Sequence, residues 1–473
     1  QNNSDAIHSD TIYLRTAVMI NLPEGGVGVR VTTLQECGNT RNIDMRIGDL
    51  YIKLLKTTIH ESCPWFYAPR CDLVGYYAIG FITSRVNQSD YLPSVLPDKA
   101  EVYDDRSDEW KEIELVDGRS TTTKNHRLAV CLQPVYLMAD WPLIPSFFET
   151  WIGNGATIFY IYVHSISEEV DLMIKMYEDQ EDIEVVRVDW PTVPTEKLDE
   201  DNLNPNNRMY RTEVATAVND CILRARGTAE LAVSSDLDEI ITPLNLKGEN
   251  ESLLDIIDDY LTQKLENGAL PGAFLFLQSF AYADNDFFSV AHPSKLSFYH
   301  YRNVSYENKV WPRGTRSKVI FVPDRVFRAH VHDTVNFESE RWDTAVIDTN
   351  RARVLHFRQV ASPAMQHDVI VVGSDVFREA AARWQKAYSS RVEAAMEQSE
   401  RVALQGAFNL NFASLVWPNF GEQVLKEIEV CRVENFEIKE NKCVTEQRCR
   451  STMKTLRPHQ WVEPVSDEAW VVI

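Results

Sequence analysis

The stretch AELAVSSDLDEIITP, residues 229–243, decides the fold because it joins an apolar strand to an acidic turn. Ala229–Ser234 is predicted as a strand, and Asp236-Leu237-Asp238 follows it almost directly. Where a strand leaves a sheet, two Asp residues two apart can both point toward the carboxyl edge. Such a pair suits a hard divalent cation that keeps open positions for phosphate oxygens. D-x-D alone usually marks a solvated turn, so its position in the fold decides its meaning.

Three strand–helix units are predicted ahead of this motif. Their strands are apolar, β-branched or aromatic, and their helices carry one apolar face. The strands lie within residues 126–136, 156–163 and 183–188, and the helices at 143–152, 167–179 and about 209–226. Repeated alternation of this kind implies right-handed βαβ units and a mostly parallel sheet. Ligands of such sheets bind beyond the carboxyl ends of the strands, where Asp236 and Asp238 are expected.

The segments on either side of this region differ in character. Residues 1–125 contain short β-rich runs such as Val27–Thr33 and Val74–Thr83, broken by Gly, Pro, Asn and Asp clusters. A segment of this length and pattern favours a β-sandwich, and the polar stretch Asp117–His126 is the predicted boundary. Helical pattern returns at about 363–405. We therefore predict an α/β fold with a β-domain at 1–125, a catalytic domain at 126–360 and a helical, irregular extension at 361–473.

Composition excludes some partners and favours a secretory compartment. The 473 residues carry a formal charge of −22 and are 44% hydrophobic, which is globular composition that would be repelled by nucleic acid. No apolar run reaches the roughly 20 residues that span a bilayer. The chain begins with Gln, so we expect that a signal or anchor segment has been removed. Eight cysteines favour disulfides, and the polar tail around Cys443 and Cys449 suggests crosslinks there.

Two classes of enzyme use D-x-D at a strand end. In haloacid-dehalogenase-like phosphatases the first Asp is a nucleophile, but that motif lies on the first strand and wants Thr or Val where Ile240 stands. Nucleotide-sugar glycosyltransferases place D-x-D after a half-sheet like this one. In them a cation bridges the motif and the diphosphate, which also reconciles an acidic protein with an anionic substrate.

Six segments resemble glycosyltransferase family 92 in order over about 230 residues. They are RLAVCLQPVY (127–136), FYIYVHSISEEV (159–170), AVNDCILRAR (217–226), SSDLDEIITP (234–243), SKVIFVPDRV (317–326) and VLHFR (354–358). The chain resembles the nematode members that transfer galactose to the core fucose of N-glycans. The resemblance implies a GT-A, Rossmann-like catalytic domain, inverting β1,4 transfer from UDP-galactose, Mn²⁺, and the lumenal part of a type II Golgi membrane protein. In plant relatives a carbohydrate-binding β-domain comes first.

The resemblance also assigns the metal site. Asp236 and Asp238 match the D-x-D motif, with Asp238 as the first choice for a direct ligand, and Glu239 is expected to order the loop through backbone hydrogen bonds. His356 matches the C-terminal histidine of the metal site. His330 and His332 share one face of a predicted strand and compete with His356 for this role.

Binding and catalytic residues are predicted from strand ends and loops. Pro134, His164 and Asp189 stand at three successive strand ends and are expected to contact the uracil or ribose. Four further residues follow: Arg316 and Lys318 to balance diphosphate charge, Trp311 to stack on an acceptor sugar, and Asp333 or Asp284 as the base that takes the acceptor hydroxyl's proton. The sequence does not choose between the two bases.

The expected partners are UDP-galactose and a fucosylated N-glycan, without nucleic acid, and with contact to a membrane only through an anchor outside this chain. A homodimer is compatible with the sequence. Two alternatives stay open: a carbohydrate-binding protein that has lost its metal and its catalysis, and the phosphatase described above.

Overall fold

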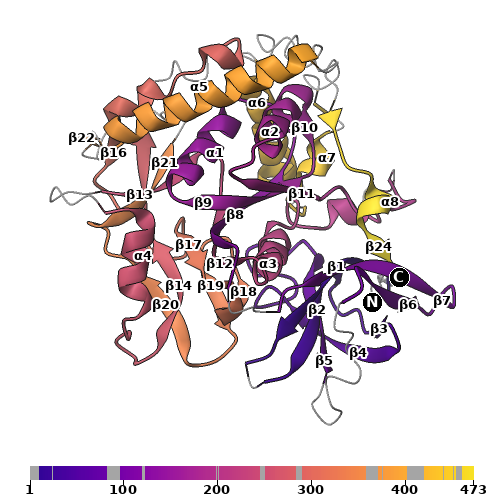
Figure 1. Ribbon diagram of the computed structural model, residues 1–473. Helices are drawn as coiled ribbons and strands as arrows, with labels where there is room; N and C mark the ends of the chain where they lie inside the picture. The colour runs from indigo at the N-terminus through magenta and orange to yellow at the C-terminus, as the bar shows by residue number, and fades with distance from the viewer. Residues whose placement is uncertain are drawn as a thin grey trace.

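The computed structural model in Figure 1 gives the arrangement of the chain. It describes residues 10–23, 25–82, 96–119, 123–198, 200, 202–244, 251–283, 290–357, 371–374, 376–401, 420–439, 442–450, 452–453 and 461–473.

The first seven strands form a closed barrel. They are β1 (Ile12–Asn21), β2 (Val27–Glu36), β3 (Ile43–Ile47), β4 (Leu50–Thr58), β5 (Leu73–Ile82), β6 (Lys99–Asp104) and β7 (Glu109–Asp117). Their order is β2-β5-β4-β3-β6-β7-β1, and β1 pairs back onto β2. The β1–β7 pairing is parallel and the others are antiparallel, so the barrel is mixed. The predicted β-sandwich is therefore wrong. Strand patterns alone do not tell whether a sheet folds over or closes on itself.

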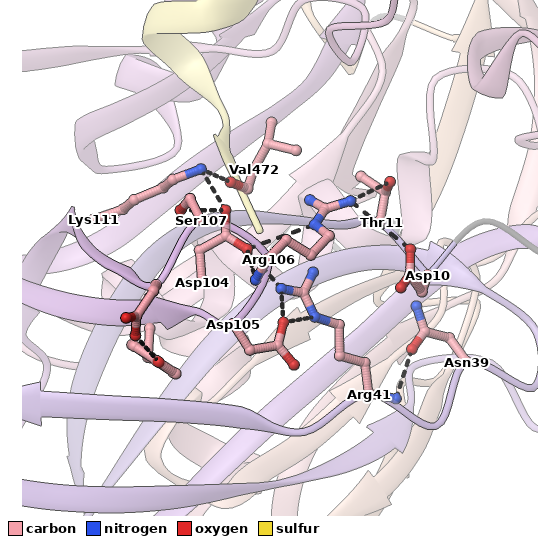
Figure 2. A network of polar contacts seen from close by, with 12 residues as sticks. Asp10, Thr11, Asn39, Arg41, Asp104, Asp105, Arg106, Ser107, Lys111 and Val472 are labelled. Atoms are coloured by element: carbon pink, nitrogen blue, oxygen red, sulfur yellow. Dashed lines mark hydrogen bonds and ion pairs between the residues drawn. The ribbon is translucent and has the colours of Figure 1, made fainter.

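The final residues of the sequence complete this barrel. Strand β24 (Val471–Val472) pairs with the start of β1, and Ile473 is fully buried in the barrel core. Figure 2 shows the polar network beside it, in which Asp104 is ion-paired with Arg41 at 2.6 Å and Lys111 at 2.8 Å. Burial would raise the pKa of Asp104, but these cations hold it well below its usual range. Lys111 also donates to the carbonyl of Val472 at 2.8 Å, which ties the C-terminal strand to the network.

The second sheet has the order β11-β9-β8-β12-β17-β14-β20. Its strands are β8 (His126–Val135), β9 (Ala156–Val163), β11 (Glu184–Asp189), β12 (Ala229–Ser235), β14 (Leu270–Phe276), β17 (Lys318–Phe321) and β20 (Trp342–Val346). The first four pair in parallel, but β17 runs antiparallel between β12 and β14. A third sheet, β13-β21-β15-β16-β22, is also mixed.

These pairings correct the predicted GT-A, Rossmann-like and mostly parallel fold, which the structure contradicts. Among the strands that are described, antiparallel pairings outnumber parallel ones, and the molecule combines a closed mixed barrel with mixed sheets. The sequence pattern located the segments at 318–322 and 353–357 as strands but carried no information on their direction. A short segment such as β17 can return in either sense once its loop is long enough.

Helix α3 (Val214–Ala225) lies between the barrel and the second sheet (Figure 1). It is buried on nearly every side because one face packs on β8 and β12 and the other on β1, β2 and β5. Its contact with β5 requires a glycine, since a Cβ at Gly75 would lie 1.8 Å from the hydroxyl of Thr216. The helix begins later than the predicted residue 209, because Arg211 and Glu213 have left-handed φ angles of 52° and 54°.

The remaining helices cover the other face. Helices α1 (Leu143–Gly153) and α2 (Glu168–Glu178) pack beneath the long α5 (Arg378–Arg401), the orange helix in Figure 1. Ser167 caps α2 as predicted, accepting a hydrogen bond from the Val170 N–H at 3.3 Å. The other helices are α4 (Leu253–Leu261), α6 (Gly421–Arg432), α7 (Glu446–Arg450) and α8 (Ser466–Ala469). None of the described helices is both long and apolar enough to cross a membrane.

All eight cysteines form disulfides, as the sequence predicted. The pairs are Cys37–Cys63, Cys71–Cys443, Cys131–Cys221 and Cys431–Cys449. The Cys71–Cys443 bridge joins the barrel to the C-terminal segment, and Cys131–Cys221 joins β8 to α3.

Candidate functional site

The acidic loop, residues 236–239, connects β12 to β13 (Glu239–Pro243). A backbone hydrogen bond of 3.4 Å from Glu239 N–H to Asp236 closes the turn. Glu239 lies opposite His356 in the antiparallel pairing of β13 with β21 (Ala352–Phe357). The N–H of Phe357 also donates to the carbonyl of Asp238 at 2.8 Å. The backbone of β21 thus holds the loop and brings His356 beside it.

Asp238 and His356 form the closest pair of predicted metal ligands. Their Oδ2 and Nε2 atoms are 3.1 Å apart, and the other ring nitrogen of His356 lies 3.3 Å from Glu239 Oε1. Burial would lower the pKa of His356, but the Asp238 carboxylate and the other acids of the loop raise it above its usual value. The structure therefore brings together these two residues, which are more than a hundred positions apart in the sequence.

Lys318 neutralises the other half of the acidic loop. Its ammonium is fully buried at the start of β17 and lies 2.7 Å from Asp236 and 2.9 Å from Glu239. Burial alone would raise the pKa of Asp236, but Lys318 lowers it; for Glu239, burial dominates and raises the pKa to about 7. Glu239 is thus held by side chains, not by the backbone hydrogen bonds that we expected. The contact of Lys318 with a diphosphate stays a prediction.

The chemistry of these side chains fits a divalent cation. Carboxylate oxygens together with an imidazole nitrogen are ligands that Mn²⁺ accepts. Asp238 and His356 are already adjacent, and the Asp238 side chain is 39% exposed. Within the described part of the chain, no group of three or more acidic, His or Cys side chains is gathered closely enough to hold a metal alone. A cation that takes one or two protein ligands and shares phosphate oxygens needs no larger cage.

The residues predicted to bind the nucleoside lie apart from one another. Pro134 is the next-to-last residue of β8, His164 follows β9, and Asp189 ends β11, as expected. His164 is buried against Gln447, and burial lowers its pKa to about 3, so it is neutral. Asp189 borders a separate cavity of about 350 Å³ beside Arg15. Their roles stay predictions.

The predicted diphosphate and acceptor residues cluster in one loop. Arg316 lies over the rings of Trp311 and Phe280, 5.0 and 5.2 Å from their centroids. Lys309 also lies over Trp311, at 4.0 Å, so an acceptor sugar would share that ring with two cations. Of the proposed bases, Asp333 accepts two hydrogen bonds from Arg313, at 2.6 and 2.9 Å, and Asp284 lies outside the described residues.

A cleft of about 580 Å³ opens beside the acidic loop, and Asp236 lines it. His330 and His332, the competing metal ligands, line the same cleft, and burial lowers the pKa of each to about 4. His332 Nδ1 lies 3.0 Å from the carbonyl of Ser317, whereas Asp238 and His356 meet each other directly. Within the described residues, His356 is therefore the better placed partner for Asp238.

Several lining residues were missed by sequence reasoning. The barrel contributes His60, Trp65 and Tyr67, and the segment before α3 contributes Tyr210 and Glu213. The aromatic run WFY at 65–67 was a signal, but nothing in the sequence placed a barrel loop against the end of β12.

Comparison with known proteins identifies the family. Two curated relatives in Caenorhabditis elegans match: Glycosyltransferase family 92 protein F13G3.3 is 22% identical over 210 residues, and protein F59C6.8 is 24% identical over 118 residues. These matches cover 43% and 25% of this chain, which spans only 37% and 22% of the length of those relatives.

A solved structure, HddC from Yersinia pseudotuberculosis, matches 49% of this chain and 93% of its own at 11% identity, but its TM-score of 0.22 carries no argument. The model of glycosyltransferase family 92 matches residues 126–409, which include the acidic loop and His356. Because this match spans more than half of the sequence, the chain belongs to glycosyltransferase family 92.

Proposed function

We propose that this glycosyltransferase moves galactose from UDP-galactose to a glycan, with inversion and with Mn²⁺, and that its acceptor is the core fucose of N-glycans, joined in a β1,4 linkage. The pairing of Asp238 with His356 beside a cleft lined by Asp236 is the observation that carries the proposal. Family membership supports a sugar donor and a glycan acceptor. It leaves the phosphatase alternative without support.

The side chains of the loop divide the work between them. Asp238 and His356 would hold Mn²⁺, which when bound supplies positive charge to the leaving diphosphate. Lys318 keeps Asp236 and Glu239 compensated, so the loop presents fewer negative charges to an anionic donor. A base must take the proton of the attacking hydroxyl, and Asp333 and Asp284 remain our candidates. Arg313 would keep Asp333 ionised in that role.

We further propose the Golgi lumen as the compartment, with this chain as the lumenal part of a type II membrane protein. Four disulfides support an oxidising compartment.

One experiment tests the activity. The chain is incubated with Mn²⁺, UDP-galactose and a core-fucosylated N-glycan, and the mass of the glycan is followed. A gain of one hexose is expected. UDP-glucose in place of UDP-galactose tests the donor, and the glycan without fucose tests the acceptor. Binding of the glycan without transfer under every condition would instead support a non-catalytic carbohydrate-binding protein.

A further inference from the structure

The cleft beside the acidic loop is built by two parts of the molecule. One wall is the aromatic loop, residues 60–71, which connects β4 to β5 of the barrel. The other wall comes from the segment before α3 and from His330 and His332, with Asp236 also lining it. The barrel therefore supplies one wall of the space next to the proposed metal ligands.

The aromatic loop presents a cluster of stacked rings to this space. Trp65 lies 4.7 Å from His60, in a stacked arrangement, and 4.6 Å from His330 across the cleft. Tyr210 and Tyr67 meet the same indole edge-on, at 5.6 and 5.1 Å. Trp65 is 7% exposed, whereas Tyr67 is 71% exposed, so the cluster runs from a buried floor to an open rim. Rings in this arrangement offer apolar planes to the C–H faces of a sugar.

Three ring nitrogens on the cleft wall are buried without a hydrogen-bond partner among the described residues. They are His60 Nδ1, Trp65 Nε1 and His330 Nε2. Leaving a buried donor or acceptor unpaired is costly, and native proteins rarely do so without a reason. A ligand rich in hydroxyl groups would supply both donors and acceptors at this wall.

The charges of the cleft favour a neutral ligand. Among the described residues that line it, Arg211 alone carries a permanent positive charge, and Glu213 and Asp236 are acidic. A diphosphate would find little compensation at this wall. Neutral rings and two carboxylates are instead the groups that hydrogen-bond to sugar hydroxyls and stack on sugar faces.

The aromatic loop is anchored at both ends. Cys63 is bridged to Cys37 of the barrel, and Cys71 is bridged to Cys443 of the C-terminal segment. Opposite it, Glu213 is held by the hydroxyl of Thr216 at 2.7 Å. A site built from tethered walls can bind a flexible glycan without first ordering itself.

We propose that the acceptor glycan binds in this cleft, with Trp65 and Tyr67 of the barrel stacking on its sugars and with His60 and His330 hydrogen-bonding to its hydroxyls. The inference rests on the proposed function, since it makes the barrel part of the acceptor site of that reaction. It excludes a purely structural role for the aromatic loop.

The test compares two variants of the loop with one matched control. Tyr67→Ala removes the exposed ring, and Trp65→Phe keeps a ring but removes the indole N–H. The control is Tyr51→Ala, because Tyr51 is also an exposed tyrosine of the barrel, 52% exposed, but does not line the cleft. Binding of a core-fucosylated N-glycan is measured by calorimetry without donor, binding of UDP is measured with Mn²⁺, and the acceptor KM is measured during transfer.

We expect Tyr67→Ala and Trp65→Phe each to weaken glycan binding and raise the acceptor KM about tenfold, the factor expected for one well-formed aromatic contact. Binding of UDP should stay unchanged, and the control should behave as wild type. Weakened UDP binding, or an unchanged glycan affinity and KM, would overturn the inference. Glycan binding that depends on these rings without any transfer would refute the proposed function alone, and a wild-type chain that neither binds nor transfers would refute both.

Discussion

At the scale of single residues, Lys318 is the side chain on which the charge balance of the acidic loop depends. It is fully buried between Asp236 and Glu239, at 2.7 and 2.9 Å. We expect Lys318→Met to lower the free energy of unfolding by about 3 kcal/mol, because it leaves carboxylates close together without a counter-charge. Denaturant unfolding of the variant and the wild type measures this. A variant as stable as the wild type would show that Lys318 is not needed for this balance.

Asp238→Asn tests the metal. It keeps the size of the side chain but removes an anionic ligand, so turnover should fall at least about a hundredfold, roughly 3 kcal/mol. The melting temperature should hardly change, since the Asp238 side chain is partly exposed. EDTA should abolish wild-type transfer and Mn²⁺ should restore it. Full activity of Asp238→Asn in EDTA would rule out the proposed role of the metal.

His356→Ala should have a milder effect than Asp238→Asn. Loss of one neutral ligand weakens cation binding, and excess Mn²⁺ should partly restore turnover because the carboxylate remains. A titration of activity against Mn²⁺ measures the shift. If saturating Mn²⁺ changes nothing while activity is lost, His356 acts in another way.

At the scale of elements, a buried acid joins three helices. Glu149 of α1 accepts a hydrogen bond from Tyr177 of α2 at 2.9 Å and another from Arg391 of α5 at 3.2 Å. Burial raises the pKa of Glu149 from 4.5 to about 7 despite the nearby Arg391. The folded protein therefore keeps this proton up to about pH 7, whereas the unfolded chain loses it near pH 4.5. Its contribution to stability is complete below pH 4.5 and is lost as pH rises through 7.

Glu149→Gln should remove this pH dependence. Between pH 5 and pH 8 the wild type should lose about 2 kcal/mol of stability relative to the variant. The measurement is the difference in melting temperature between the two proteins at each pH, which cancels other titrating groups. A difference that is the same at pH 5 and pH 8 would contradict the raised pKa.

How far the sequence predicted the elements depends on what each pattern encodes. Apolar runs located β8, β9, β11 and β12, and Ser167 marked the start of α2, because burial and capping leave local signals. The direction of β17 and the closure of the barrel left none, since both depend on pairings far apart in the chain. The same holds for the site: the resemblance pointed to Asp238 and His356, but the wall formed by Trp65 comes from a loop that no local pattern connects to β12.

At the scale of the whole molecule, the two ends of the structure meet in the barrel. Ile12 and Ile473 exchange backbone hydrogen bonds of 2.9 and 3.0 Å, and both side chains are fully buried. We expect Ile473→Ala to cost about 3 kcal/mol, as for other large-to-small changes in a core. The loss should appear in the unfolding of the barrel, followed by its tryptophan fluorescence. The exposed Val465, changed to Ala, serves as the control.

The pairing of β24 with β1 also sets an order for biosynthesis. During translation, β1 leaves the ribosome long before the residues of β24 exist, so the nascent chain carries an uncovered flank at the start of β1. The Cys71–Cys443 crosslink likewise has to wait for a thiol made near the end of synthesis. Completion of the barrel then becomes a late event that reports on the whole chain, and a ribosome that stalls early releases a product whose bare strand edge chaperones can recognise.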